Sequence, residues 1–403
     1  MTADHPAVDP RREPVLLGYA RTPIGRLGGA FAGLAAVDLG GRAIASALER
    51  AGVPADRVDQ VLMGHVLQAG QGQITARQAA QQGGIGMNVP ATTINKVCLS
   101  GMSAVALADQ QIRLGEASVV VAGGMESMSQ APYLLPDARF GYRMGDGKLV
   151  DAMVHDGLWC AFDDAHMGAT SDAMNARYGI DRAVQDEWAA RSHERAATAT
   201  KEGRFEGEVV PVEIPQRRGE PEIVTEDEGV RPGTTTESLG KLKPAFAADG
   251  TITAGNASQI SDGAAALVVA SRAVAEELGA TPVGRIRGYG TVAGPDPSLH
   301  HQPAEAIRLA AEKAGVAPDG LEVYEINEAF AAVAKHSTDL LGVDEARVNP
   351  HGGAVAVGHP IGASGARITA AVLHQLAARG GGFGAAALCG GGGQGDALLL
   401  EVG

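Results

Sequence analysis

The sequence predicts an α/β protein made of two stacked, duplicated halves, with a long insertion in the first half. Three observations support this fold class. Predicted strands that consist of consecutive Val, Ala and Leu residues alternate with predicted helices. Several passages recur at a nearly constant spacing, and this spacing is interrupted once. Continuous apolar strands are usually covered by helices on both faces. The length of 403 residues allows two or three domains with large cores.

Three pairs of passages recur along the chain at spacings of about 261 to 266 residues. Chance similarity between segments rich in Ala and Gly is the alternative explanation, but three pairs in nearly one register indicate a duplicated unit. Each copy is expected to run strand, helix, strand, helix, strand. The pairs are Ala51–Val61 with Ala314–Tyr324, Cys98–Ser103 with His359–Ser364, and Ser118–Gly124 with Gly384–Gly391.

The register breaks at the last strand of each copy. In the second copy, the last strand, Asp396–Val402, follows directly after Gly384–Gly391. The matching strand of the first copy is Asp262–Val269, which lies 134 residues before it, whereas the other pairs are separated by about 263 residues. Roughly 130 residues are therefore inserted in the first copy, between Ser127 and about Ser258. The insertion is distinct in composition and contains an amphipathic helix and a charged passage, Asp181–Thr200 and Glu202–Glu228.

Composition excludes several classes of protein. The net charge of −14 argues against nucleic acid as the main partner, because phosphate contacts need a basic face. Three cysteines without a Cys-x-x-Cys pair indicate neither a disulfide framework nor a zinc knuckle, and they suit a reducing compartment. We find no signal-peptide pattern and no apolar run of the ~18 residues that a membrane span needs. We therefore expect a cytoplasmic protein without a membrane segment.

Cys98 stands where a strand turns into a helix. It follows the apolar run Ala91–Ile94 and precedes the helical pattern Ala104–Leu114. A helix start offers unpaired N–H groups and the positive end of the helix dipole, and both stabilise the nucleophilic thiolate. Activation of Cys98 is one interpretation, and a buried cysteine that only packs is the other.

His359 occupies the position in the second copy that corresponds to Cys98 in the first. If a pseudo-twofold axis relates the halves, the two helix starts meet, and a Cys beside a His is the nucleophile and base of acyl transfer. Cys389 precedes the run Gly390–Gly393, where backbone N–H groups can approach a ligand closely. Asn327 either caps a helix or holds a water or a carbonyl oxygen. Cys98, His359 and Cys389 could also ligate a metal, but their glycine-rich surroundings favour an anion hole, so we expect no metal.

Four motifs together resemble the thiolase family, and the resemblance covers nearly the whole chain. It implies duplicated α/β halves, each five-stranded, stacked in five layers (αβαβα), with an inserted loop domain. The implied domains are 1–127 plus 259–280, 128–258, and 281–403. The motifs are Asn95–Gly101, Asn327–Phe330, Gly358–Gly365 and Cys389–Gly392.

The resemblance also implies catalytic roles. Cys98 would carry the acyl group, His359 would take its proton, and Cys389 would remove a proton from the methyl carbon of a second acetyl-CoA. His359 and a water on Asn327 would stabilise the enolate oxygen. The backbone N–H groups of Cys98 and Gly391 would form the other oxyanion hole, in which one donor contributes about 10²–10³ in rate.

The same resemblance suggests substrate contacts, mostly from the insertion. Arg231 would face the adenine end of CoA, Ser258 the pantetheine amides, and Phe246 and Ala254 would line the tunnel between them. The remaining expected contacts are the pair that would close the acyl pocket, His166 and Met167, and Phe330 from the second motif.

Two residues depart from the family pattern. Leu99 stands where many members carry a small residue, and Gln259 replaces a common glycine. Gln259 and Ser261 also occur in relatives that degrade long chains, so chain length stays open.

The implied reaction is the reversible condensation of two acetyl-CoA to acetoacetyl-CoA and CoA, with CoA as substrate and no separate cofactor. Two alternatives remain: a 3-ketoacyl-CoA thiolase of fatty-acid β-oxidation with broader specificity, and a thiolase-like subunit that only binds. The resemblance further implies a homotetramer, and Met128–Asp146 is the expected contact between dimers.

Overall fold

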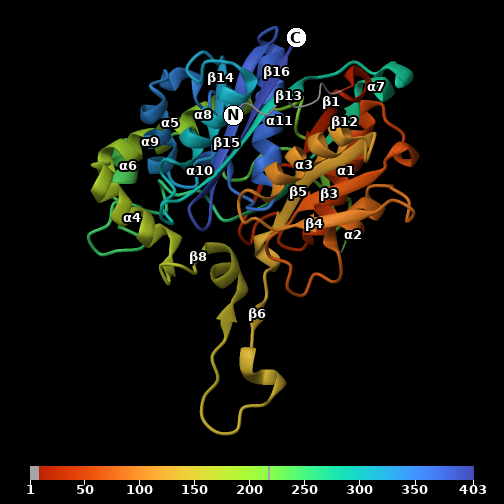
Figure 1. The fold of residues 1–403 in the computed structure, drawn as a ribbon. Coiled ribbons are helices and arrows are strands. Elements are labelled where there is room, and N and C mark those ends of the chain that lie inside the picture. The colour runs from red at the N-terminus through yellow and green to blue at the C-terminus, as the bar shows by residue number, and fades with distance from the viewer. Residues whose placement is uncertain (1–8, 217) are drawn as a thin grey trace.

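Two β-sheets lie on either side of a central pair of helices, and further helices cover the outer face of each sheet, so the chain forms five layers (Figure 1). The computed structural model describes residues 9–216 and 218–403. The central pair is α3 (Ser100–Leu114) and α11 (Ser364–Ala378). This arrangement confirms the predicted stacking of two α/β halves.

The first sheet has the strand order β1-β12-β5-β3-β4, and a short strand, β2, pairs with β12. Its outer face packs on α1 (Ala36–Ala51) and α2 (Thr75–Gln82), where small and branched apolar side chains form one core. Strands β3, β4 and β5 are parallel, while β12 runs antiparallel to β1 and β5. The strands are β1 (Pro14–Arg21), β2 (Gly25–Arg26), β3 (Gln60–Gly64), β4 (Ala91–Ile94), β5 (Val119–Ser127) and β12 (Ser261–Ser271).

The second sheet has the order β13-β16-β15-β14, and its outer face packs on α8 (Gln302–Ala314) and α9 (Ala331–Leu341). Its parallel pair is β14 and β15, which matches the parallel strands of the first sheet. The strands are β13 (Arg285–Ala293), β14 (Val323–Ile326), β15 (Gly382–Gly390) and β16 (Gln394–Val402). Along the chain, α7 (Arg272–Leu278) links the first half to the second, and α10 (Ala354–Val357) precedes His359.

The duplication extends to details of the backbone. The pairing of β1 with β12 shifts register between Leu16 and Gly18, and the pairing of β13 with β16 shifts between Ile286 and Gly288. Helices α1 and α8 both end at a glycine in the left-handed region, Gly52 and Gly315, where a side chain would be strained. These matches confirm the repeat predicted from the spacing.

The second sheet has four strands instead of the five that the family resemblance implied. Where a fifth strand would lie beside β14, only one bridge forms, between Tyr324 and Val348. The Asn349 side chain takes the place of the next strand pair: its Oδ1 accepts from Ile326 N–H at 2.9 Å and its Nδ2 donates to Ile326 O at 2.9 Å. Pro350 follows and has no N–H to continue a ladder.

The two central helices approach closely because glycines line their first turns. A Cβ on Gly101 would lie 2.9 Å from Gly362 O, and one on Gly365 would lie 2.4 Å from Met102 N. Since real Cβ atoms need more room, these positions admit only glycine at this helix spacing. The starts of α3 and α11 therefore meet, as the pseudo-twofold argument predicted.

The predicted insertion is confirmed by the pairing of Ser127 at the end of β5 with Asp262 near the start of β12. The chain between them leaves the sheet, and residues 133–150 project from the body as a long arm (Figure 1). The predicted amphipathic helix is α5 (Arg182–Lys201), with Asp181 as its N-cap. The other inserted elements are β6 (Tyr133–Leu134), β7 (Val150–Asp151), β8 (Trp159–Cys160), β9 (Ala165–His166), α4 (Met167–Tyr178), β10 (Val212–Ile214), β11 (Glu222–Val224) and α6 (Thr236–Gly240).

The division of the chain into 1–127 plus 259–280, 128–258 and 281–403 stays a prediction about folding units. In residues 9–216 and 218–403, every helix is too short or too polar to cross a membrane.

Candidate active site

The loop before α3 carries Cys98 in a strained turn. Helix α3 begins at Ser100, four residues earlier than the sequence pattern predicted, so Cys98 lies just outside the first turn. Val97 has a φ of 50°, a region that β-branched residues rarely adopt. Backbone strain of this kind often occurs at functional sites because the surrounding structure must maintain it.

The Cys98 thiol is buried, with 6% of its surface exposed. Burial raises the pKa of the Cys98 thiol to about 12, although its own backbone N–H and that of Gly391 donate to the sulfur. In the free protein, desolvation of the thiolate outweighs these two donors, so the helix start alone does not activate Cys98. A base must take the proton before Cys98 can attack.

His359 is the candidate for that base, because Gly362 of its loop meets Gly101 at the start of α3. Its Nδ1 lies 2.6 Å from Ser364 Oγ, and Ser364 Oγ donates to Pro360 O at 3.0 Å. Because the hydroxyl has a single proton, Ser364 Oγ accepts from Nδ1–H, and this assigns the free lone pair to Nε2. Burial, with the nearby Arg367 charge, lowers the pKa of His359 to about 3. The imidazole is thus neutral at pH 7.

Asn327 follows β14 and lies beside His359. Its Nδ2 is 3.5 Å from His359 Nε2, and its Oδ1 is buried and has no hydrogen-bond partner among the described residues. The helix-cap alternative is excluded, because α9 begins at Ala331 with Phe330 as its N-cap. A buried acceptor without a donor is rare in proteins, so Asn327 Oδ1 has the chemistry to hold a water.

Cys389 lies near the end of β15, with 1% of its surface exposed. Burial raises the pKa of its thiol, and the neighbouring charge of an ionised Cys98 raises it further. The two sulfurs are therefore close enough to interact electrostatically. Gly391, two residues on, turns its N–H toward Cys98. Cys98, Asn327 and His359 lie on loops and Cys389 lies near the end of β15, and these segments meet where the halves join.

Glu328 holds the Asn327 loop in place, a role that the sequence reasoning missed. Its carboxylate accepts from Trp188 Nε1 at 2.8 Å, Ser192 Oγ at 2.7 Å, Asn349 Nδ2 at 2.9 Å and Val355 N–H at 3.0 Å. These donors come from α5 of the insertion and from the second half. The carboxylate therefore ties the insertion to the site. Glu328 lies in the motif Asn327–Phe330, but the motif does not show which distant segments supply its donors.

Glu126, at the end of β5, is a second buried carboxylate that was missed. It accepts from Val66 and Leu67 N–H at 3.1 Å each and from Gly362 N–H at 3.0 Å, and His65 Nε2 lies 3.4 Å away. Burial raises the pKa of Glu126 to about 7. Because Gly362 belongs to the His359 loop, Glu126 connects that loop to the first half.

An aromatic wall formed by three of the predicted substrate residues stands next to Cys389. The rings of His166 and Phe246 stack at 4.5 Å, and Phe246 meets Phe330 edge to face at 6.3 Å. Met167 and Phe246 pack against the buried cluster that contains Phe330 and Cys389. The structure therefore brings these four predicted residues together beside a catalytic candidate.

Ser258 also reaches this region, through backbone pairing. Its N–H donates to Ala329 O at 3.1 Å, and Ala331 N–H donates to Asn256 O at 2.9 Å. The loop that contains Ser258 is thus joined to the loop that follows Asn327. Ser258 is half-buried, whereas Ala254 on the same loop is exposed.

Arg231 lies apart from the catalytic group. It is exposed, its N–H donates to His193 Nδ1 at 3.2 Å, and its guanidinium makes no hydrogen bond or ion pair within residues 9–216 and 218–403. Arg231 and Ala254 are thus the two predicted substrate residues that the structure leaves at the surface.

The unusual Gln259 has a structural explanation. Its Nε2 donates to three carbonyl oxygens, those of Gly229, Val355 and Ala356, at 2.9 to 3.0 Å. Its own carbonyl accepts from His359 N–H at 3.1 Å. Gln259 therefore joins the insertion, α10 and the His359 loop.

His300, in the loop before α8, is buried beneath the insertion. Its Nε2 lies 2.7 Å from Asn175 Oδ1 on α4, while its neighbour His301 is half-buried. Local sequence does not reveal this burial, because α4 of the insertion covers the loop.

Comparison with known proteins agrees with this geometry. The family description "Thiolase, N-terminal domain" matches residues 15–273, and "Thiolase, C-terminal domain" matches residues 280–402. A probable acetyl-CoA acetyltransferase of Mycolicibacterium smegmatis is 58% identical over 96% of this chain and 100% of its own length. The acetyl-CoA acetyltransferase of Cupriavidus necator is 50% identical over 96% of this chain and 98% of its own.

A crystal structure of the Bacillus anthracis acetyl-CoA acetyltransferase superposes with a TM-score of 0.94 at 41% identity, covering 97% of this chain and 98% of that one. Two family descriptions that together span almost the whole chain, relatives matched over nearly their full length and a shared fold all lead to one assignment. The chain belongs to the thiolase family.

Proposed function

We propose that the protein is an acetyl-CoA acetyltransferase, which condenses two acetyl-CoA to acetoacetyl-CoA and CoA and also catalyses the reverse cleavage. The observation that carries this proposal is a neutral His359 whose Nδ1–H is donated to Ser364, which leaves Nε2 unprotonated, on a loop that meets the helix start after the buried Cys98 thiol. The similarity to the acetyl-CoA acetyltransferases from Mycolicibacterium smegmatis, Cupriavidus necator and Bacillus anthracis supports the same activity.

In the first step, His359 Nε2 takes the Cys98 proton and the thiolate attacks the thioester carbonyl. The N–H groups of Cys98 and Gly391, which now face the sulfur, would then donate to the carbonyl oxygen as it becomes negative. Cys389 is a neutral thiol at rest and protonates the departing CoA thiolate. The products are acetyl-Cys98, CoA, an imidazolium at His359 and a thiolate at Cys389.

In the second step, the Cys389 thiolate removes a proton from the methyl group of a second acetyl-CoA. Its raised pKa makes it a strong base, and acetylation of Cys98 removes the charge that would oppose it. The His359 imidazolium and a water on Asn327 would stabilise the enolate oxygen. The enolate carbon attacks acetyl-Cys98, and the released Cys98 thiolate regains its proton from His359, so the cycle closes with protons balanced.

The substrate contacts are proposed on the same basis. The wall formed by His166, Met167, Phe246 and Phe330 beside Cys389 suits the acyl group and the neighbouring part of the pantetheine chain. Ser258 would meet the pantetheine amides, Ala254 would border the tunnel, and the exposed Arg231 guanidinium suits the phosphates at the adenine end.

The experiment that tests the function is the loss of thioester absorbance of acetoacetyl-CoA when CoA is added. We expect turnover with ping-pong kinetics, because an acetyl-enzyme forms between the two half-reactions. A folded protein without turnover would favour the subunit that only binds. Faster cleavage of a long 3-ketoacyl-CoA than of acetoacetyl-CoA would favour the β-oxidation enzyme.

A homotetramer is proposed for the assembly, with the arm as the contact between dimers. Supporting it, the arm exposes large apolar side chains, and Phe140 and Met144 are 91% and 97% exposed. Apolar side chains so exposed are typical of a surface that a partner covers. Light scattering tests this proposal. We expect the full chain to be a tetramer, and a variant with residues 133–150 replaced by a short Gly-Ser link to be a dimer.

A cytoplasmic location is also proposed, and the three free cysteines support it, because a reducing compartment keeps thiols reduced.

A further inference from the structure

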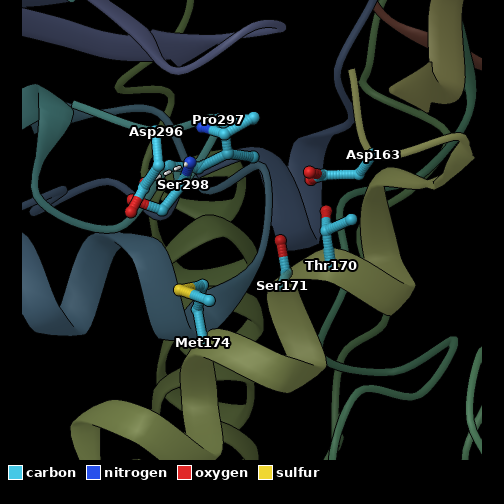
Figure 2. A pocket seen from close by; sticks show the side chains of 8 residues that line it. Asp163, Thr170, Ser171, Met174, Asp296, Pro297 and Ser298 are labelled. Carbon is cyan, nitrogen blue, oxygen red and sulfur yellow. Dashed lines mark hydrogen bonds between the residues drawn. The ribbon is translucent and has the colours of Figure 1, made fainter. Parts of the chain in front are cut away.

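A partly open cavity of ≈130 Å³ lies between the first turns of α4 and the loop that precedes α8 (Figure 2). It is distinct from the group around Cys98 and His359, neither of which lines it. The lining residues are Asp163, Thr170, Ser171, Met174, Asp296, Pro297, Ser298 and Leu299.

Leu299 borders both this cavity and the buried cluster beside the candidate acyl site. It lines the cavity, and it also belongs to the buried cluster that contains Cys389 and Phe330, with Met167 packed against that cluster. Only 3% of the Leu299 surface is exposed. One apolar side chain thus touches both the cavity and the cluster, and we call it the wall.

Most of the other residues that line the cavity are polar. Ser171 is 2% exposed, its Oγ forms no hydrogen bond with any of the described residues, and Figure 2 shows it directed into the cavity beside Thr170 and Asp163. Ser298 donates to Asp296, and this contact lowers the pKa of Asp296 below its ordinary value. The cavity is large enough for water, and a buried hydroxyl without a protein partner needs one.

We propose that Leu299 and Ser171 set the acyl chain length: Leu299 stops a short acyl group at the wall, and the hydrated cavity behind it disfavours a longer apolar chain. An alkyl chain that passed the wall would displace water from Ser171 Oγ and lie near the Asp296 carboxylate without replacing their hydrogen bonds. This inference rests on the proposed function and names its substrate class, short-chain 3-ketoacyl-CoA.

The test compares 3-ketohexanoyl-CoA with acetoacetyl-CoA in CoA-dependent cleavage. Removing the wall and the hydroxyl together, in Leu299→Ala with Ser171→Ala, should raise the ratio of kcat/KM for the longer substrate to that for the shorter one by roughly ten-fold or more, the effect of one or two methylenes gaining an apolar pocket. Leu299→Ala alone should raise the ratio less, because Ser171 would still need water.

Met174→Ala is the matched control, since Met174 lines the same cavity but is absent from the cluster with Cys389. Enlarging the cavity behind an intact wall should leave the ratio unchanged. An unchanged ratio in the double variant, with acetoacetyl-CoA still cleaved, would overturn the inference, and so would an equal rise in Met174→Ala. Leu299→Val with Ser171→Ala is the substitute pair if the Ala variant does not fold.

Failure of the proposed function gives a different result. In that case the wild-type chain would cleave neither substrate.

Discussion

Ser364 decides which nitrogen of His359 is basic, although it lies five residues away along the chain. The hydroxyl is bound to Pro360 O, so it accepts from Nδ1–H and leaves Nε2 without a proton. The proposed role of His359 depends on this tautomer. Ser364 is therefore a positioning residue within the motif Gly358–Gly365.

The Ser364→Ala variant should lower kcat by roughly ten-fold, because one buried hydrogen bond contributes about 1 to 1.5 kcal/mol and about 1.4 kcal/mol is a factor of ten in rate. KM for acetoacetyl-CoA should change little, since Ser364 is not among the proposed substrate contacts. Ser337→Ala is the control: Ser337 is equally buried and donates to a backbone carbonyl, that of His300. Equal losses in both variants would indicate that Ser364 only supports the fold.

Cys389 and Cys98 have separate proposed roles, and one substitution separates them. The Cys389→Ala variant should still accept an acetyl group from acetyl-CoA on Cys98, because His359 takes the Cys98 proton, but it should not condense. Mass spectrometry of the intact chain measures acetylation, and the absorbance of acetoacetyl-CoA measures condensation. A folded Cys389→Ala protein that is never acetylated would contradict this division.

At the scale of elements, the closeness of α3 and α11 places the two helix starts together. Gly365 meets the backbone of Met102, and a Cβ added at Gly365 would lie only 2.4 Å from Met102 N. Backbone atoms cannot yield as a flexible side chain can, so a methyl group there must push the helices apart.

The Gly365→Ala variant should lose about 1 to 3 kcal/mol of stability, the usual effect of overpacking a core. It should also lose activity, because the shift of α11 displaces His359 relative to Cys98. Gly240→Ala at the end of α6 is the control, since a Cβ there meets nothing within 4 Å. Thermal unfolding followed by circular dichroism measures the stability of both variants. An unfolding midpoint for Gly365→Ala equal to that of Gly240→Ala would refute the packing argument.

At the scale of the whole molecule, buried histidines make stability depend on pH. Burial lowers the pKa of these residues from 6.5 to about 3 or 4: His65, His193, His300, His351 and His359. Between their folded pKa and about 6.5, the unfolded chain binds more protons than the folded chain, so acid favours unfolding. Two buried glutamates, Glu126 and Glu325, act in the opposite sense, because burial raises the pKa of each to about 7.

Since the five histidines outnumber the two glutamates, the free energy of unfolding should decrease as the pH falls from 6.5 to 4.5. Urea unfolding at several pH values measures it, and the slope should correspond to about three protons taken up on unfolding. His300→Asn removes one of the five groups and should reduce that slope by about one proton. A free energy of unfolding that rises toward pH 4.5 would show that the glutamates dominate.

Much of the fold and part of the candidate site could be predicted from the sequence. The recurring spacing determined the two halves, the place of the insertion and the meeting of the Cys98 and His359 helix starts. It could do so because a duplicated unit repeats its strands, caps and helix starts at constant intervals, and related elements meet near the axis between the copies. Cys389 and the glycines after it were found from their position at the end of a strand.

Only the tertiary structure decided how those groups are tuned. Burial raises the pKa of Cys98 although it lies next to a helix start, and Glu126 and Glu328 gather donors from segments far apart in the chain. The Asn349 side chain replaces a strand that the family resemblance implied. Burial and hydrogen bonding depend on which distant segments pack together, and the local periodicity of the sequence does not predict this packing. The sequence by itself thus determined which elements carry the reactive groups, and the packing of the halves and the insertion decided their protonation and their neighbours.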